Sequence, residues 1–370
     1  MTTKEKVLNL LTNAAGSQNQ NQNEKAISGE KLAAECGVSR AAIWKAVNAL
    51  RAQGFSIEGT TNGGYILNDD DIFTVDSLRQ TLEKDFSKCH IEVFKEIDST
   101  NTYAKRVLTE CGNLRLADGT LTSAGKIYHK AVIAAETQTA GRGRLGRTFV
   151  SPAKTGIYLT IIYAPQGGIT NPAKITAFSA VAVVRAIKEV YKIDTQIKWI
   201  NDIYAGGKKI CGILTEGFTN FETGTIESAI IGIGINIRNN PDLFPEEVAK
   251  VAGAIEDTIC GNDSSNSAAE TGSESSKNPT RAELAAHVAE NVLKILDEPS
   301  DAVIAEYKAA SFLIGQTLTV HPVIGNDHES YSAKAVDIDQ NAGLVVELAD
   351  GTKKTLSSGE VSLSSSAFVK

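Results

Sequence analysis

The chain has 370 residues, of which 42% are hydrophobic and 22% are charged, and its formal net charge is −7 at pH 7. This length predicts two or three domains in a folded, soluble protein, and no apolar run reaches the roughly 20 residues that a membrane helix needs. The acidic balance argues against a protein that coats nucleic acid non-specifically, although a local basic face remains compatible with it.

The start of the chain and its cysteines predict a reducing compartment. The residues from Met1 to Lys6 lack the apolar stretch of a secretory signal. The five cysteines are scattered and show no CxxC spacing. Neither a disulfide framework nor a zinc site is therefore expected, no metal ligands are assigned, and we predict a cytoplasmic protein.

The first region, residues 1–68, predicts two helices joined by a short turn. Ser28 is placed to cap a helix over residues 29–36, and Ser39 is placed to cap a second helix over residues 40–53. A glycine follows each helix and provides its end.

A hairpin pattern follows these two helices. Strand-like residues 55–58 and 65–67 flank the turn signal Asn62-Gly63-Gly64. Two helices with a short glycine turn and a β wing are typical of a winged helix-turn-helix domain.

The second helix predicts a DNA-binding surface. Ile43, Val47 and Leu50 recur on one face, and no acid occurs between positions 35 and 58. Arg, Lys and Asn on the opposite half can reach phosphates and base edges in the major groove. Trp44 also lies on that half, although a large aromatic is not a usual base reader. The alternative is a protein-interaction domain with a solvated basic face. The predicted DNA contacts are Ser28, Ser39, Arg40, Ala41, Lys45 and Asn48.

The middle region, residues 69–312, alternates predicted strands and helices. A buried strand over residues 131–136 leads into residues 141–146, which match G-x-G-x-x-G. We reject a dinucleotide fingerprint, because a strand over residues 156–162 follows in place of a helix. In addition, no Asp or Glu occurs from position 137 to 188 to hold a ribose.

The same loop predicts an anion site. Arg142, Arg144 and Arg147 stand on a glycine frame. Glycine lets the backbone approach a ligand closely, and guanidinium groups bind carboxylate and phosphate with two hydrogen bonds. A basic surface loop without a ligand is the alternative.

Two further segments support an anion site. Residues 97–101 open a helix and offer a polar helix N-terminus, although such residues usually serve only as a cap. Lys198 ends one predicted strand and Lys209 begins another. Lysines at the mouths of buried strands suggest a bound anion, whereas solvated lysines in a hairpin turn are the alternative.

From residue 313 onward the pattern is almost purely strand, which predicts a small β barrel or sandwich. Two polar stretches, residues 17–23 and 257–280, are too poor in apolar groups to pack, and we expect both to be mobile loops.

Together these motifs resemble those of the bifunctional bacterial biotin–protein ligase and biotin operon repressor, and they occur in the order of that family. The chain departs from the family pattern at Ile200, where proline is usual, and at Phe149, where tryptophan is common. Extra residues near 116–130 are expected to lengthen loops. The resembling segments are Ser28-Gly29-Glu30, Ser39-Arg40-Ala41-Ala42-Ile43, Asp98-Ser99-Thr100-Asn101, Gln138 to Gly146, Lys198-Trp199-x-Asn201-Asp202, Lys209-x-x-Gly212-Ile213-Leu214 and Gly232-Ile233-Gly234-Ile235-Asn236.

The resemblance implies an α+β multidomain chain. Residues 1–68 would form the winged helix-turn-helix, residues 69–312 an α/β biotin-ligase domain of the class II synthetase type, and residues 313–370 an SH3-like β barrel. It also implies that biotin and ATP give biotinyl-5'-AMP, which then modifies a lysine of a biotin carboxyl carrier protein. Ligand-dependent repression of biotin-synthesis genes would accompany this activity.

The resemblance also implies roles for individual residues, with Arg144 and Lys209 as the catalytic pair. The implied biotin ligands are Ser99, Thr100, Asn101, Gln138, Arg142, Gly143, Arg144 and Lys209. The implied ATP ligands are Arg147, Phe149, Lys198, Asn201 and Asn236.

The implied partners are the carrier protein, operator DNA and a second copy of the chain when the adenylate is bound, with no membrane. Mg²⁺ is expected with ATP, held mainly through its phosphates. Two other functions remain open: a winged-helix regulator that senses a small carboxylic acid without catalysis, and a ligase for lipoate or octanoate.

Overall fold

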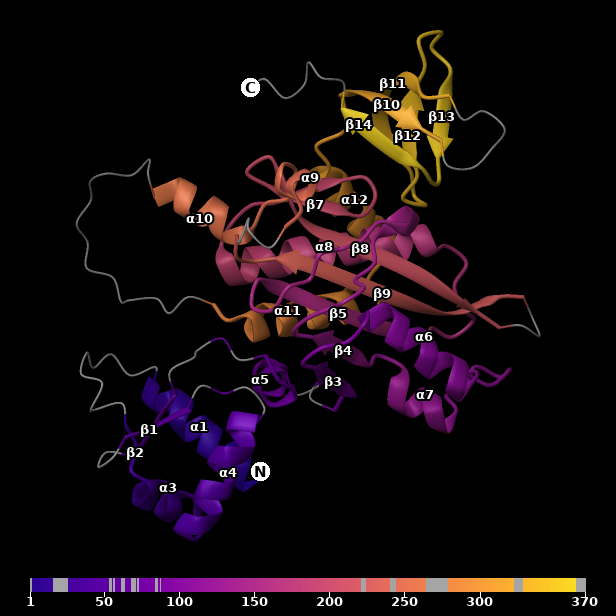
Figure 1. Ribbon diagram of the computed structural model, residues 1–370. Helices are drawn as coiled ribbons and strands as arrows, with labels where there is room; N and C mark the ends of the chain where they lie inside the picture. Colours follow the sequence, from indigo (N-terminus) through magenta and orange to yellow (C-terminus); the bar gives the residue numbers. More distant parts are fainter. Residues whose placement is uncertain are drawn as a thin grey trace. The chain divides into compact units, whose positions relative to one another are not determined.

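The structure is a computed structural model, and it describes residues 2–15, 26–52, 55, 57–60, 64–67, 71, 73–83, 86, 88–220, 224–239, 244–263, 279–322 and 329–363. The chain divides into two compact units, Met1–Thr81 with Glu270–Glu283, and Leu82–Ala269 with Leu284–Lys370 (Figure 1). Within the described ranges, no helix is both long enough and apolar enough to cross a bilayer.

The first unit contains the predicted helix pair and wing. Ser28 Oγ accepts a hydrogen bond from the Lys31 N–H at 3.1 Å, and Gly37 ends the helix with a φ of +68°. Gly54 and the turn at positions 61–63 lie outside the described residues. The elements are α1 (Thr3–Ala15), α3 (Gly29–Cys36), α4 (Arg40–Ala52), β1 (Ile57–Thr60), β2 (Gly64–Leu67) and α5 (Val75–Thr81), and β1 pairs antiparallel with β2.

The predicted apolar face of α4 is confirmed. Ile43, Val47 and Leu50 are buried completely and share a core with Val7 and Leu11 of α1. Because this face is used for packing, the basic half of the same helix faces solvent.

A seven-stranded sheet forms the centre of the second unit, in the order β3-β4-β5-β9-β8-β7-β6. Only β3 and β4 pair in parallel; every other pair along the sheet is antiparallel. The strand that follows the arginine loop is thus β5 running back against β4, which confirms the rejection of a dinucleotide fold. The strands are β3 (Ile91–Phe94), β4 (Val132–Ala135), β5 (Gly156–Tyr163), β6 (Gln196–Lys198), β7 (Asp202–Ala205), β8 (Lys208–Thr219) and β9 (Ile226–Asn236).

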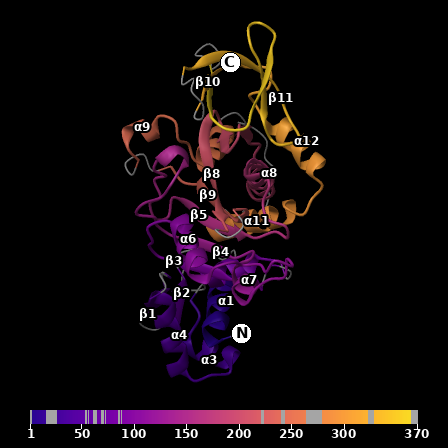
Figure 2. The same cartoon turned by 90° about the vertical axis from the view of Figure 1, so that its right-hand side faces the viewer.

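Helices cover both faces of this sheet (Figure 2). Thr215 and Glu216 are neighbours on β8, so their side chains point to opposite faces. Thr215 accepts a hydrogen bond from Thr176 of α8, whereas Glu216 contacts Lys105 of α6. The helices are α6 (Thr100–Cys111), α7 (Ser123–Tyr128), α8 (Pro172–Tyr191), α9 (Glu246–Ala249), α10 (Ile255–Asp263), α11 (Arg281–Ile295) and α12 (Ser300–Ala310).

Two predicted loops contain helices. The loop prediction for residues 257–280 was wrong up to Asp263, because α10 continues to that residue; positions 264–278 and the polar stretch at 17–23 lie outside the described residues. Asp257 accepts a hydrogen bond from the Ala254 N–H, and its charge suits a helix N-terminus. In the stretch 116–130, Thr122 caps the short helix α7.

The C-terminal strands form a five-stranded antiparallel sheet in the order β13-β12-β11-β10-β14. Its strands carry the buried residues Leu318, Val320, Ala335, Leu344 and Val346, which confirms the predicted strand pattern. The strands are β10 (Thr317–His321), β11 (Tyr331–Ile338), β12 (Leu344–Glu347), β13 (Lys353–Leu356) and β14 (Glu360–Leu363).

Candidate functional site

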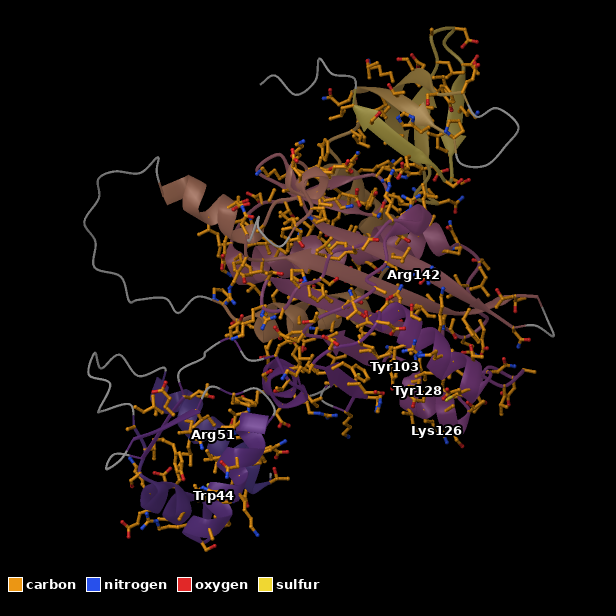
Figure 3. All side chains as sticks on the ribbon, viewed as in Figure 1. Trp44, Arg51, Tyr103, Lys126, Tyr128 and Arg142 are labelled. Atoms are coloured by element: carbon orange, nitrogen blue, oxygen red, sulfur yellow. The ribbon has the colours of Figure 1, made fainter. Side chains whose placement is uncertain are left out.

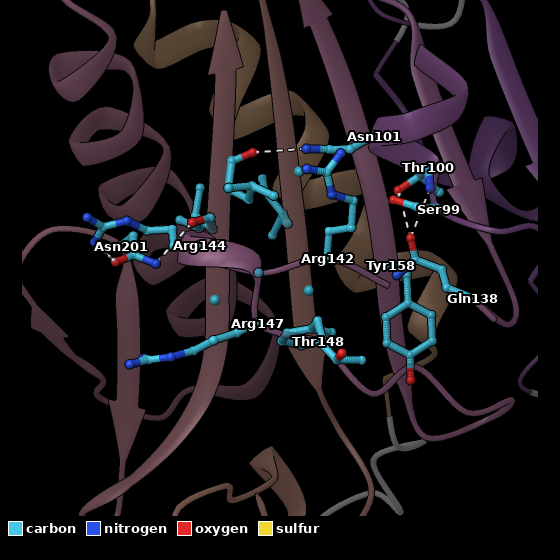
Figure 4. A pocket seen from close by; sticks show the side chains of 18 of the residues that line it. Ser99, Thr100, Asn101, Gln138, Arg142, Arg144, Arg147, Thr148, Tyr158 and Asn201 are labelled. Atoms are coloured by element: carbon cyan, nitrogen blue, oxygen red, sulfur yellow. Dashed lines mark hydrogen bonds between the residues drawn. The ribbon is translucent and has the colours of Figure 1, made fainter. Parts of the chain in front are cut away.

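A cavity of about 140 Å³ opens on the α6 side of the central sheet. It brings together side chains from the first turn of α6, from the arginine loop and from β8 and β9 (Figure 4). Arg144 and Lys209, more than sixty positions apart in the chain, line the same cavity. The predicted ligands that line it are Ser99, Thr100, Asn101, Gln138, Arg142, Gly143, Arg144, Arg147, Phe149, Asn201 and Lys209.

Two predicted ATP ligands do not line this cavity. Asn236 is buried, and its amide donates to the Gly253 carbonyl at 3.2 Å. Lys198 is partly buried at the end of β6, and burial lowers the pKa of its amine, with Asp202 opposing this shift and Lys209 adding to it. Their roles in ATP binding remain predictions.

Hydrogen bonds fix the polar end of the cavity. The Thr100 N–H, at the start of α6, donates to Gln138 Oε1 at 2.9 Å. The Gln138 amide then donates to Ser151 Oγ at 2.8 Å, and the Ser151 hydroxyl donates to the Phe149 carbonyl. Among the described residues, the Ser99 hydroxyl hydrogen and the second Gln138 amide hydrogen have no acceptor. This end of the cavity therefore offers hydrogen-bond donors to a ligand.

Asn101 is held tightly beneath the cavity. Its Nδ2 donates to the Leu214 carbonyl at 3.2 Å and to Glu216 Oε2 at 2.9 Å. Its Oδ1 accepts from Thr160 Oγ1 at 2.6 Å. Both amide hydrogens are thus used within the protein, which favours a positioning role for Asn101 over a direct donor role toward biotin.

Glycines in β9 make room for these side chains. A Cβ at Gly232 would lie 2.3 Å from Asn101 Oδ1, and a Cβ at Gly234 would lie 2.5 Å from the Phe149 ring. Alternate residues of a strand share one face, so the Gly-x-Gly spacing leaves the cavity side of β9 bare. The sequence motif was recognised by resemblance, and the structure supplies its steric reason.

The arginine loop is anchored at the second and third of its guanidinium groups. Arg144 donates to Asn201 Oδ1 at 2.8 Å and to the Gly359 carbonyl at 3.1 Å, and Arg147 pairs with Glu360 at 2.7 Å. Asn201 follows Ile200 and a cis Trp199–Ile200 peptide bond, and its own amide donates to the Ile213 carbonyl at 3.1 Å.

The other two cations pair with acids from the sheet. Lys209 Nζ lies 2.6 Å from Asp202 Oδ1, and Arg142 lies 3.6 Å from Glu216 Oε1. The sequence around the loop contains no acid, but the fold brings carboxylates to it from distant positions. An anionic ligand would therefore meet cations that carboxylates already hold in place.

Sequence reasoning missed Thr160, Glu216 and Glu360. Glu216 had a usable signal, because a charged residue inside a long strand requires partners to be buried. Thr160 gave no signal, since a threonine in a strand is ordinary.

The first unit presents the predicted DNA contacts in two groups. Ser28 and Ser39 use their hydroxyl oxygens as helix caps, the latter accepting from the Ala42 N–H at 3.3 Å. Arg40, Ala41 and Lys45 are exposed on α4. Trp44 on the same helix is 58% exposed and is not packed into the core of this unit (Figure 3). Asn48 accepts a hydrogen bond from Arg51 at 3.3 Å.

Three regions of the chain match known families. Residues 93–236 match the Biotin/lipoate A/B protein ligase family, residues 20–66 match an HTH domain, and residues 321–364 match the Biotin protein ligase C terminal domain. The central domain of the chain is thus similar to ligases of the biotin/lipoate class, and the same chain matches a helix-turn-helix domain.

Curated relatives carry the name of a protein with two activities. The chain is 34% identical over 230 residues to Bifunctional ligase/repressor BirA of Bacillus subtilis, an alignment that covers 62% of this chain and 66% of the relative. It is 30% identical over 210 residues to the protein of the same name from Escherichia coli, which covers 57% and 59% respectively. The matched segment spans less than two thirds of either relative. These matches confirm the resemblance to bifunctional biotin ligase and repressor proteins.

A solved structure shows the same fold. Biotin protein ligase from Aquifex aeolicus in complex with biotin and ATP superposes with a TM-score of 0.55 and 24% identity, covering 74% of this chain and 98% of that chain. At this identity the likeness establishes the fold alone.

Proposed function

We propose that this chain joins biotin to ATP to give biotinyl-5'-AMP and pyrophosphate, and then transfers the biotinyl group to a lysine of a biotin carboxyl carrier protein. The observation that carries the proposal is the lining of one cavity by Arg144 and Lys209 together with Arg142. The named relatives and the matched ligase family support the same chemistry.

The chemistry suits these groups. A carboxylate oxygen of biotin attacks the α-phosphorus of ATP, and the bond to the pyrophosphate oxygen breaks. Negative charge develops on the phosphorus oxygens, where preorganised cationic donors stabilise it. In the second step the lysine amine attacks the acyl carbon of the mixed anhydride, loses a proton and releases AMP. Arg144 and Lys209 would hold the phosphate and carboxylate oxygens in both steps.

Mg²⁺ is proposed to arrive with ATP and to be held mainly through the phosphates. In the described part of the chain, no group of three or more His, Cys, Asp or Glu side chains is arranged to hold a metal ion.

Pyrophosphate release tests the proposed reaction. We expect the chain to release pyrophosphate when ATP and biotin are both present, and much less when lipoate or octanoate replaces biotin. If no pyrophosphate is released with any of these acids, the chain would instead be a regulator that senses a carboxylic acid without catalysis. Faster pyrophosphate release with lipoate than with biotin would identify lipoate as the substrate.

The proposal extends to DNA. The exposed basic half of α4 is placed to enter a major groove, and the helix-turn-helix match supports this use. Repression of biotin-synthesis genes would require the adenylate-bound chain to dimerise on two half-sites of an operator.

Lys45→Ala is expected to weaken operator binding and to reduce the slope of log K against log salt by about 1, because one phosphate contact is lost. The measurement is a titration of the full chain, with biotin and ATP, against the promoter of its biotin-synthesis genes at several salt concentrations. Lys126→Ala, an exposed lysine of α7 in the other unit, is the control. Equal slopes for the two variants would contradict the predicted surface.

The proposal also covers the domain limits, the C-terminal fold, the cellular location and the dimer. The domain limits are residues 1–68, 69–312 and 313–370, and the curved C-terminal strands would close as an SH3-like barrel (Figure 2). We propose a cytoplasmic location, where ATP, the carrier protein and DNA are all available. Sedimentation with and without biotin and ATP tests the dimer.

A further inference from the structure

Glu216 lies next to the cavity, and the sequence analysis assigns it no role. It lies on β8, and its carboxylate accepts from Lys105 at 2.6 Å and from Asn101 at 2.9 Å. Arg142 of the arginine loop lies 3.6 Å away. Glu216 itself does not line the cavity, so it would act on a ligand only through its neighbours.

We propose that Glu216 is a positioning residue that orients Thr100 toward the ligand through a relay of Asn101 and Thr160. The inference rests on the proposed function, since it assigns the relay to the binding of the ureido group of biotin. It goes further by naming residues outside the cavity that set the hydrogen-bonding character of the cavity wall.

The relay begins with an obligate acceptor. An ionised carboxylate only accepts hydrogen bonds. Burial raises the pKa of the Glu216 carboxyl, but the hydrogen bonds from Lys105 and Asn101 outweigh burial and keep the pKa below its ordinary value. Asn101 must therefore turn its NH₂ toward Glu216, as it does toward the Leu214 carbonyl, and its oxygen then faces Thr160.

The relay continues to the cavity wall. Thr160 has one hydroxyl hydrogen, and the 2.6 Å contact directs it to Asn101 Oδ1. Thr160 Oγ1 and Thr100 Oγ1 lie 2.8 Å apart, so once the Thr160 hydrogen is directed to Asn101, only Thr100 has a hydrogen for this contact. The Thr100 hydroxyl also has a second inward acceptor, Gln138 Oε1, at 3.2 Å. With its hydrogen committed inward, the Thr100 oxygen faces the cavity as an acceptor.

The resulting wall matches a ureido group. Ser99 and Gln138 present donors, and Thr100 presents an acceptor, at the end of the cavity away from Arg144 (Figure 4). A ureido group carries both a carbonyl oxygen and N–H donors, so it satisfies both kinds of partner. A carboxylate has no hydrogen to give Thr100 and would bind at the cationic end.

Glu216→Gln disturbs the first step of this relay. A glutamine has one side-chain oxygen, so it accepts from Lys105 or from Asn101 and turns its own N–H toward the other donor. Thr160→Val disturbs the second step, because it removes the hydroxyl of a fully buried residue and keeps the shape of the side chain. Neither of the two substituted residues itself lines the cavity.

The experiment is a double-mutant cycle on the full chain, with biotin binding measured by calorimetry without ATP. We expect each single change to raise the Kd for biotin about tenfold and the double change to raise it by about the same factor, because both break one relay. The KM for ATP should stay within about twofold of wild type, since Arg144 and Lys209 are held by Asn201 and Asp202 and not by Glu216.

Glu298→Gln is the matched control, because it also removes the charge of a glutamate that pairs with an arginine, Arg185, outside the cavity. It should leave the Kd for biotin unchanged. The relay is wrong if Glu216→Gln binds biotin as wild type does, or if the two changes multiply to about a hundredfold loss as independent lesions would. Should Glu216→Gln fail to fold, a wild-type Kd for Thr160→Val alone would overturn it. Failure of the wild-type chain to bind biotin would instead remove the proposed function.

Discussion

Arg144→Ala and Lys209→Ala are each expected to lower biotin-dependent pyrophosphate release by about 100-fold or more, the effect of removing a preorganised donor from a developing negative charge. Both side chains line the cavity, and each is already held by a partner, Asn201 for Arg144 and Asp202 for Lys209. Because these partners fix the cations before the ligand arrives, little reorganisation is needed when charge develops.

Lys208→Ala is the control for this pair. Lys208 is an exposed neighbour of Lys209 on β8, and its side chain points away from the cavity. It should retain pyrophosphate release, and all three variants should keep the thermal midpoint of wild type within a few degrees. A normal rate of adenylate formation by either Arg144→Ala or Lys209→Ala would show that the catalytic pair is assigned wrongly.

Gly232→Ala is expected to raise the Kd for biotin by about 100-fold and to lower the free energy of unfolding by about 2–4 kcal/mol, since a buried polar network is broken. The added Cβ would lie 2.3 Å from Asn101 Oδ1, and β9 is fixed between β5 and β8. Asn101 must therefore leave its place and give up its hydrogen bonds to Leu214, Glu216 and Thr160. Calorimetry and denaturant unfolding measure the two effects.

A second substitution separates stability from binding. Asn101→Ala removes the atom that meets the new Cβ, so the double variant Asn101→Ala with Gly232→Ala should recover part of the lost unfolding free energy without recovering biotin affinity. Gly29→Ala is the control, because its Cβ would meet its nearest neighbour at 3.4 Å, an ordinary contact. Normal biotin binding by Gly232→Ala would contradict the steric explanation of the glycine motif.

The sequence alone determined the features that depend on neighbouring residues. The caps at Ser28 and Ser39, the buried face of Ile43 and Val47, and the strand after the arginine loop were all predicted and confirmed. These features rest on spacing and backbone chemistry within one or two turns of chain, which a sequence displays directly. The order of the motifs carried the resemblance to biotin ligases in the same way.

Only the tertiary structure decided which distant groups meet. The pairing of Arg142 with Glu216, that of Arg147 with Glu360, and the fit of Asn101 against Gly232 join residues from different strands and loops. Such contacts depend on the strand order of the sheet and on its register, and a shift of one residue would turn Glu216 to the opposite face. The sequence thus identified the cations of the site. The fold determined which carboxylates pair with them and which glycines make room for their neighbours.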